Sequence, residues 1–155
     1  MNQLVKELSL ICMLFSLVGW GNVNAAERFN SGDHGLMLHG YDAVSYFSGA
    51  PKKGLGGHSA AYKGQVYRFS SAKNKTLFVK TPEKYVPSFG GFCAYGVRMG
   101  KKFDIDPEAY EIVDGVLFVM LNRATQTLWK QDIADNINIA KQNWPVISNT
   151  SAALL

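Results

Sequence analysis

Residues 58–70 alternate between apolar and polar side chains, which is the pattern of a half-buried β-strand. Tyr67 and Phe69 fall on one face of an extended segment, and Arg68 falls on the other. Lys63 and Gly64 stand between the two alternating runs. A two-residue turn with glycine at its second position favours a tight hairpin, so the segment predicts two antiparallel strands.

A second hairpin is predicted from AYEIVDGVLFVML at 109–121, where Asp114 and Gly115 separate two runs rich in β-forming residues. The run from 116 to 121 is apolar on both faces, which indicates a central strand. By contrast, the stretch 92–99 is compatible with either a strand or a helix. Gly90 and Gly91, just before it, allow a sharp bend or a close approach of backbone.

Helices are predicted where a capping residue precedes apolar residues at helical spacing. Asp42 is expected to cap a short helix, Ser71 a helix that turns Leu77 and Phe78 inward, and Asn122 a helix through Trp129 and Ile133. A last helix from about residue 135 has three apolar residues on one face and is expected to stop at a proline. These are Ile137, Ala140, Trp144 and Pro145.

Together these elements predict an α+β fold, in which a small antiparallel sheet of hairpins has helices packed on one face. The domain is expected to span residues 36–145, after a flexible start at 26–35 and before a disordered tail at 146–155. Trp129, Ile133, Ile137 and Trp144 are expected to be largely buried.

The amino terminus has the pattern of a cleaved secretory signal, residues 1–25. Lys6 precedes an apolar run from Leu8 to Trp20, and Val23 and Ala25 stand at −3 and −1 of a cleavage site. The run is short for a bilayer span, which takes about 20 apolar residues, although an uncleaved anchor is the alternative. The predicted location is therefore periplasmic or secreted, with no stable membrane insertion after the signal is removed.

Cleavage would leave Cys93 as the single cysteine, so no internal disulfide is expected. Cys93 is then a buried small side chain, an intermolecular partner or a functional thiol. The formal net charge of +4 comes from scattered basic residues, and no nucleic-acid motif accompanies it. No nucleic-acid partner is expected.

Four motifs resemble the YHS-domain family, in its exported single-domain branch. They are HGYDAVSYF at 39–47, HSAAYKGQVYRFSSAKNKTLF at 58–78, PEKYVPSFGGFCAYGV at 82–97, and DPEAYEIVDGVLF through NWP at 106–145. The resemblance implies a link to metal handling, because the family and its TRASH-type relatives include metal sensors and transporters. Members with a clear metal site carry cysteines where this chain has Ser70 and Asn74, and His39 stands near the place of another.

Serine and asparagine are poor ligands for zinc or copper, so a four-cysteine site is excluded. His39, Cys93 and Met99 are the remaining candidate metal ligands, and Met37 is an alternative to Met99. These soft or borderline ligands suit Cu(I). His39 has a structural alternative, in which it bonds a backbone carbonyl before Gly40.

Three functions follow from these observations. The first is an exported, non-enzymatic binding protein that handles copper or a small ligand, with the tyrosines as core edges or as the wall of a ligand pocket. The second is a ligand-free protein-interaction module on a scaffold that has lost its cysteine site. The third, an enzyme using Cys93, has no triad or phosphate loop to support it, so no enzymatic activity is predicted.

The signal prediction is tested by the amino terminus of the exported protein. We expect protein recovered outside the cytoplasm to begin near Ala26, as measured by intact mass and amino-terminal sequencing. A chain that starts at Met1 and is recovered only by membrane extraction would favour the anchor instead.

Overall fold

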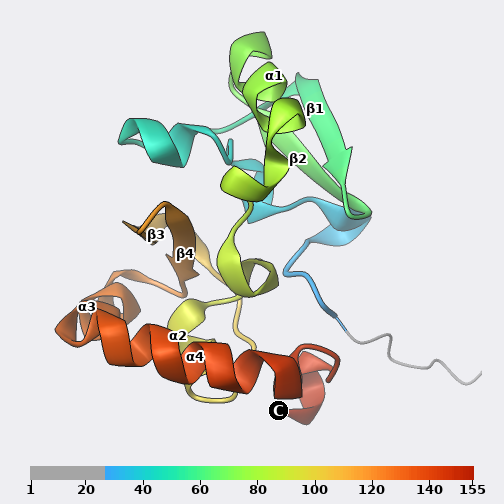
Figure 1. Ribbon diagram of the computed structural model, residues 1–155. Helices are drawn as coiled ribbons and strands as arrows, with labels where there is room; N and C mark the ends of the chain where they lie inside the picture. The colour runs from blue at the N-terminus through green and yellow to red at the C-terminus, as the bar shows by residue number, and fades with distance from the viewer. Residues whose placement is uncertain (1–26) are drawn as a thin grey trace, which may run out of the picture.

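The computed structural model describes residues 27–155, which form an α+β fold built from two hairpins and four helices (Figure 1). The first hairpin pairs β1 (Leu55–Tyr62) with β2 (Gln65–Phe69), and the second pairs β3 (Asp106–Val113) with β4 (Val116–Met120). The predicted fold class is confirmed. The predicted signal, residues 1–25, lies outside the described residues.

Both hairpins turn where the sequence predicts. Lys63 and Gly64 have φ values of 50° and 76°, and Asp114 and Gly115 have 50° and 75°. Positive φ at both central residues matches the right-handed twist of the flanking strands, and it is the reason that glycine stands second in each turn.

Each hairpin forms a two-stranded sheet of its own, so the prediction that the hairpins combine into one small sheet was wrong. The outer edge of each second strand is occupied by another segment. Leu36 bridges Val66 of β2, and Pro87 bridges Leu117 of β4, both in parallel orientation. These short bridges use the edges through which the two hairpins would otherwise pair.

The helices are α1 (Ala72–Lys80), α2 (Ala94–Arg98), α3 (Arg123–Gln131) and α4 (Ile133–Ile147). The predicted caps at Ser71 and Asn122 are confirmed, since their side chains accept from the N–H groups of Asn74 and Thr125. Helix α1 buries Phe78 but leaves Leu77 37% exposed, so the prediction that Leu77 points into the core was wrong. The stretch that the sequence left undecided contains the short helix α2.

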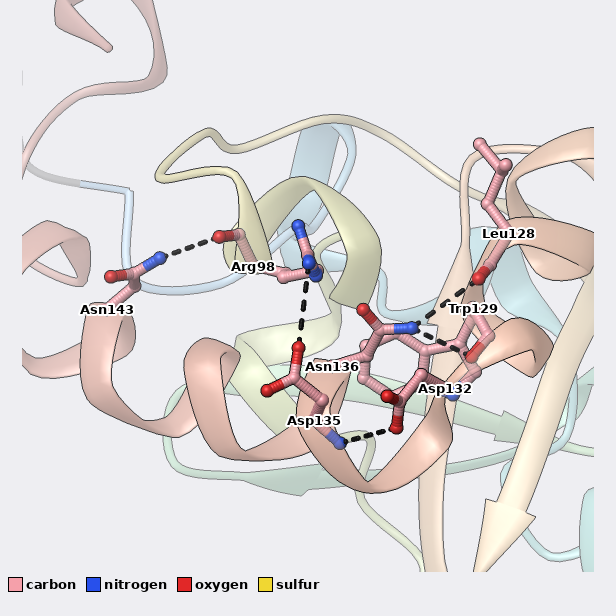
Figure 2. A network of polar contacts seen from close by, with 7 residues as sticks. All are labelled: Arg98, Leu128, Trp129, Asp132, Asp135, Asn136 and Asn143. Carbon is pink, nitrogen blue, oxygen red and sulfur yellow. Dashed lines mark hydrogen bonds and ion pairs between the residues drawn. The ribbon is translucent and has the colours of Figure 1, made fainter.

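Helix α4 runs along the bottom of the molecule in Figure 1 and is fixed by two asparagines. Asn143 donates to the carbonyls of Val97 and Arg98 at the end of α2, and Asn136 donates to the carbonyl of Trp129 at the end of α3 (Figure 2). The last carbonyls of a helix have no partner within it. One helix therefore satisfies the ends of two others and is held in a fixed position against them.

The end of α4 differs from the prediction. The helix continues two residues beyond Pro145, because the proline lacks only its own N–H and the next turn still closes through Ser148 N to Trp144 O at 2.8 Å. Residues 146–155, predicted as a disordered tail, contain the buried Ile147 and Ser148 and a short 3₁₀ helix, Ala152–Leu154.

The core gathers around aromatic rings, with Trp129 fully buried and its ring 5.3 Å from that of Phe118. Burial of Trp129 is confirmed. Ile133, Ile137 and Trp144 are only partly buried, although they pack against the core. Among residues 27–155 no helix is long and apolar enough to cross a bilayer.

The two tryptophans provide a matched test of this packing. Trp129→Ala should lower the free energy of unfolding by about 3–5 kcal/mol, because it removes a fully enclosed ring. Trp144→Ala should cost distinctly less, because that ring is partly exposed. Denaturant unfolding of both variants measures the difference, and equal losses would contradict the packing described here.

Candidate functional site

Asp42 is a buried carboxylate at the junction of three segments, with 0% of its surface exposed. Its Oδ1 accepts from the N–H groups of Val44 at 2.9 Å and Ser45 at 3.4 Å. Its Oδ2 accepts from Ser70 N at 2.8 Å, Ser70 Oγ at 2.6 Å and Asn74 Nδ2 at 2.6 Å. Asp42 was predicted to cap a short helix. Its carboxylate instead binds the turn that leads into the 3₁₀ helix Ser45–Ser48, whose N-cap is Val44, and it also binds the start of α1.

Ser70 and Asn74 are the residues that stand at cysteine positions in the resemblance to YHS domains. Both donate to the same oxygen of Asp42, and Asn74 Nδ2 also lies 3.4 Å from Ser70 Oγ. A buried charge is costly unless hydrogen bonds satisfy it. Here the donors surround a carboxylate, which leaves the cluster without the thiolate or imidazole ligands that zinc or copper favours.

Cys93 is fully buried and caps α2 with its thiol, whose Sγ accepts from Gly96 N at 3.4 Å. Burial raises the pKa of the Cys93 thiol above its ordinary value. The side chain is therefore a protonated core residue at neutral pH, which agrees with the structural alternative for this cysteine.

His39 lies at the surface with Nε2 2.8 Å from Asp104 Oδ1, so its partner is a carboxylate and not a backbone carbonyl. Asn30 Nδ2 donates to the same oxygen at 2.9 Å. Burial alone would raise the pKa of Asp104, but hydrogen bonds from Asn30, from the N–H of Ile105 and from His39 together lower it. The three side chains hold the amino-terminal segment against the loop before β3.

Met99 directly follows α2 and is 59% exposed, whereas the buried Cys93 directly precedes the same helix. Six residues of α-helix separate two Cα atoms by about 9 Å along the axis. The three predicted ligands do not share a contact: His39 pairs with Asp104, Cys93 accepts from Gly96 N, and Met99 is exposed. Residues 27–155 contain no group of three or more histidine, cysteine or acidic side chains arranged to hold a metal. Copper binding by His39, Cys93 and Met99 stays a prediction.

A cavity of about 510 Å³ opens between the first hairpin, the amino-terminal segment and α4. Four aromatic side chains contribute to its lining, namely Phe29, Tyr62, Tyr67 and Trp144. Met37, Val86 and Pro87 add aliphatic surface. The buried Met37 and Tyr67, which are 1% and 2% exposed, form the inner part of this wall.

The amino-terminal segment forms one wall of the cavity and is held closely. Asn30 N donates to Gly90 O at 2.8 Å, and Asn30 Nδ2 donates to Gly91 O at 3.1 Å. Gly90 has a φ of 62°, and a Cβ atom there would clash with the Arg28 carbonyl. This is the close backbone approach that the glycine pair allows, and it brings Arg28 and Phe29 to the cavity.

Lys102 fixes the same segment from below. Its Nζ donates to the carbonyls of Glu27 at 2.6 Å, Ser148 at 3.0 Å and Thr150 at 2.6 Å. The ammonium also lies 5.8 Å from the centre of the Trp144 ring, within range of a cation–π interaction. Burial lowers the pKa of Lys102. The three N–H groups of its ammonium nevertheless all have carbonyl acceptors, which offset the cost of burying the charge.

Two basic side chains, Arg28 and Lys63, are the charged members of the cavity lining. Among residues 27–155 neither forms an ion pair within 4 Å. Tyr67 is 2% exposed and also belongs to the cavity lining. Burial raises the pKa of Tyr67, so its hydroxyl stays neutral.

The sequence predicted only part of this cavity. It raised a pocket wall as one alternative for the tyrosines, and Tyr62 and Tyr67 do line the cavity. It missed Arg28 and Phe29, because it assigned residues 26–35 to a flexible start. The glycine pair was the available signal, since it indicated that another backbone segment approaches there.

Comparison with known proteins adds no relative to this picture, since no family model, curated protein or solved structure matches the chain.

The Asp42 cluster predicts a large loss of stability on truncation. Asp42→Ala should lower the free energy of unfolding by about 3 kcal/mol or more, because hydrogen bonds to a charged group contribute roughly 1.5–3 kcal/mol each and several buried donors lose their acceptor. Asp132→Ala is the control, since Asp132 is exposed and accepts one capping bond, from Asp135 N at 3.0 Å. It should cost about 1 kcal/mol. Similar losses in denaturant unfolding would contradict a special role for Asp42.

Proposed function

We propose that this protein is a non-enzymatic binding protein that holds a small organic molecule in its aromatic cavity. The observation that carries the proposal is the cavity of about 510 Å³ between the first hairpin, the amino-terminal segment and α4. Binding sites for small molecules are concave, mostly apolar, and usually about 300–1,000 Å³ in volume, with few polar groups. This cavity agrees with each of those properties.

The walls support binding because they are held in place without a ligand. Tyr67 comes from β2, Trp144 from α4, and Phe29 from a segment fixed by Asn30 and Lys102. A preformed apolar site loses little conformational entropy when it is filled. The chain therefore presents a ready surface for a flat apolar molecule.

Metal handling receives less support from the same geometry. The Cys93 thiol is buried and protonated, and His39 pairs with Asp104. The buried thiol would have to lose its proton before it could bind a metal, and the Asp104 contact leaves Nδ1 as the ring nitrogen of His39 that could serve as a ligand. The buried Asp42 cluster supports the idea of a YHS scaffold whose metal ligands have been replaced by hydrogen bonds, and export would bring such a binding protein to the periplasm or the cell exterior.

The binding function is tested with a neutral apolar fluorophore, N-phenyl-1-naphthylamine, titrated into the full-length protein. We expect saturable, one-to-one enhancement of its emission. Val86→Trp should weaken this binding at least tenfold, because the larger ring occupies the cavity that Val86 lines.

Val79→Trp is the matched control, since Val79 is 60% exposed on α1 and lies outside the cavity lining. It should leave binding unchanged. If the fluorophore does not bind, or if both tryptophan variants bind it equally well, the cavity is not a ligand site. The alternative of a ligand-free protein-interaction module would then take its place.

A further inference from the structure

We propose that the ligand of this cavity is an amphipathic organic anion, a flat apolar or aromatic body with one carboxylate or phosphate that pairs with Arg28 and Lys63. This inference rests on the proposed binding function and adds the chemical class of the ligand. It is carried by the charge of the lining, which includes two basic side chains and no acidic one.

The two bases have different surroundings. Arg28 has no carboxylate within 4 Å among residues 27–155. Lys63 lies near Glu83, which accepts from the Tyr62 hydroxyl at 2.6 Å. That hydrogen bond is the main cause of the lowered pKa of Glu83, and the positive charge of Lys63 contributes to it. Glu83 offsets part of the Lys63 charge, so Arg28 is the stronger attraction for an anion.

Lys102 adds positive charge behind the Trp144 wall. Because its three donors are already bound to backbone carbonyls, it does not pair with a ligand directly. Its charge nevertheless acts on the cavity, since the ammonium lies 5.8 Å from the centre of the Trp144 ring. Glu27 and Glu83 offset part of the charges of Lys102 and Lys63, so Arg28 contributes most to the repulsion of a positively charged ligand.

The rest of the lining fits the apolar body. Phe29, Tyr62 and Trp144 offer aromatic surface, and Met37 provides a flexible thioether that adapts to ring shape. Tyr67 also lines the cavity, and burial keeps its hydroxyl neutral by raising its pKa. Arginine and lysine side chains only donate, and a tyrosine hydroxyl can donate as well as accept, so an acceptor at the polar end of the ligand suits all three.

The experiment compares three compounds with the same ring system by calorimetric titration of the full-length protein. The compounds are 2-naphthoate, 2-naphthyl phosphate and the neutral 2-naphthamide. We expect at least one anion to bind about tenfold or more tightly than the amide, because a charge-assisted hydrogen bond is roughly twice as strong as a neutral one. The order of the two anions identifies the acidic group that the site prefers.

Substitution then locates the effect. Arg28→Gln and Lys63→Gln should each reduce the ratio of anion affinity to amide affinity, Arg28→Gln by more. Lys80→Gln, at the exposed end of α1 and outside the lining, is the control for net charge and should leave that ratio unchanged. Added salt should weaken the anions and not the amide.

The outcomes separate the two proposals. If the amide and both anions bind equally, or if both glutamine variants keep the full preference, the anionic class is wrong while the binding function stands. If none of the three compounds binds and the neutral fluorophore also fails, both proposals are wrong. Tighter binding of an anion that depends on Arg28 supports both.

Discussion

The buried carboxylate of Asp42 is the interaction on which much of this fold depends. It ties the turn that contains Val44 and Ser45 to the junction between β2 and α1, and five hydrogen-bond donors balance the cost of its desolvation. Strand β2 leads into that junction, and its residue Tyr67, three positions before Ser70, lines the cavity. The inner wall of the cavity is thus positioned by a polar cluster on its far side.

A second buried charge, the ammonium of Lys102, holds the opposite wall. The amino-terminal segment and the residues after α4 both contribute carbonyls to Lys102. Asn30 and the glycine pair complete the attachment of the segment. Polar contacts therefore hold the segments around the site in position, and aromatic side chains from these segments line the cavity.

The elements were predictable from the sequence where the decisive interactions are local. Turn residues with positive φ at Lys63–Gly64 and Asp114–Gly115, and capping side chains at Ser71 and Asn122, act within a few residues of their own position. The site was not predictable to the same degree. Lys102 meets carbonyls 46 and 75 positions away along the chain, and no local pattern indicates such partners. The edges of the two separate sheets are occupied through the bridges Leu36–Val66 and Pro87–Leu117, whose partners are also far apart along the chain.

The contacts of Lys102 also bring the two ends of the described fold together. Because one nitrogen binds the carbonyls of Glu27 and Thr150, the first and last parts of the described fold are spatial neighbours. A short peptide link between them would turn the domain into a closed ring. Cutting this ring at the exposed turn of Asp114 and Gly115 would give a circular permutant with new chain ends. That turn lies outside both the Asp42 cluster and the cavity lining. The order of segments along the chain is therefore separable from their arrangement around the site.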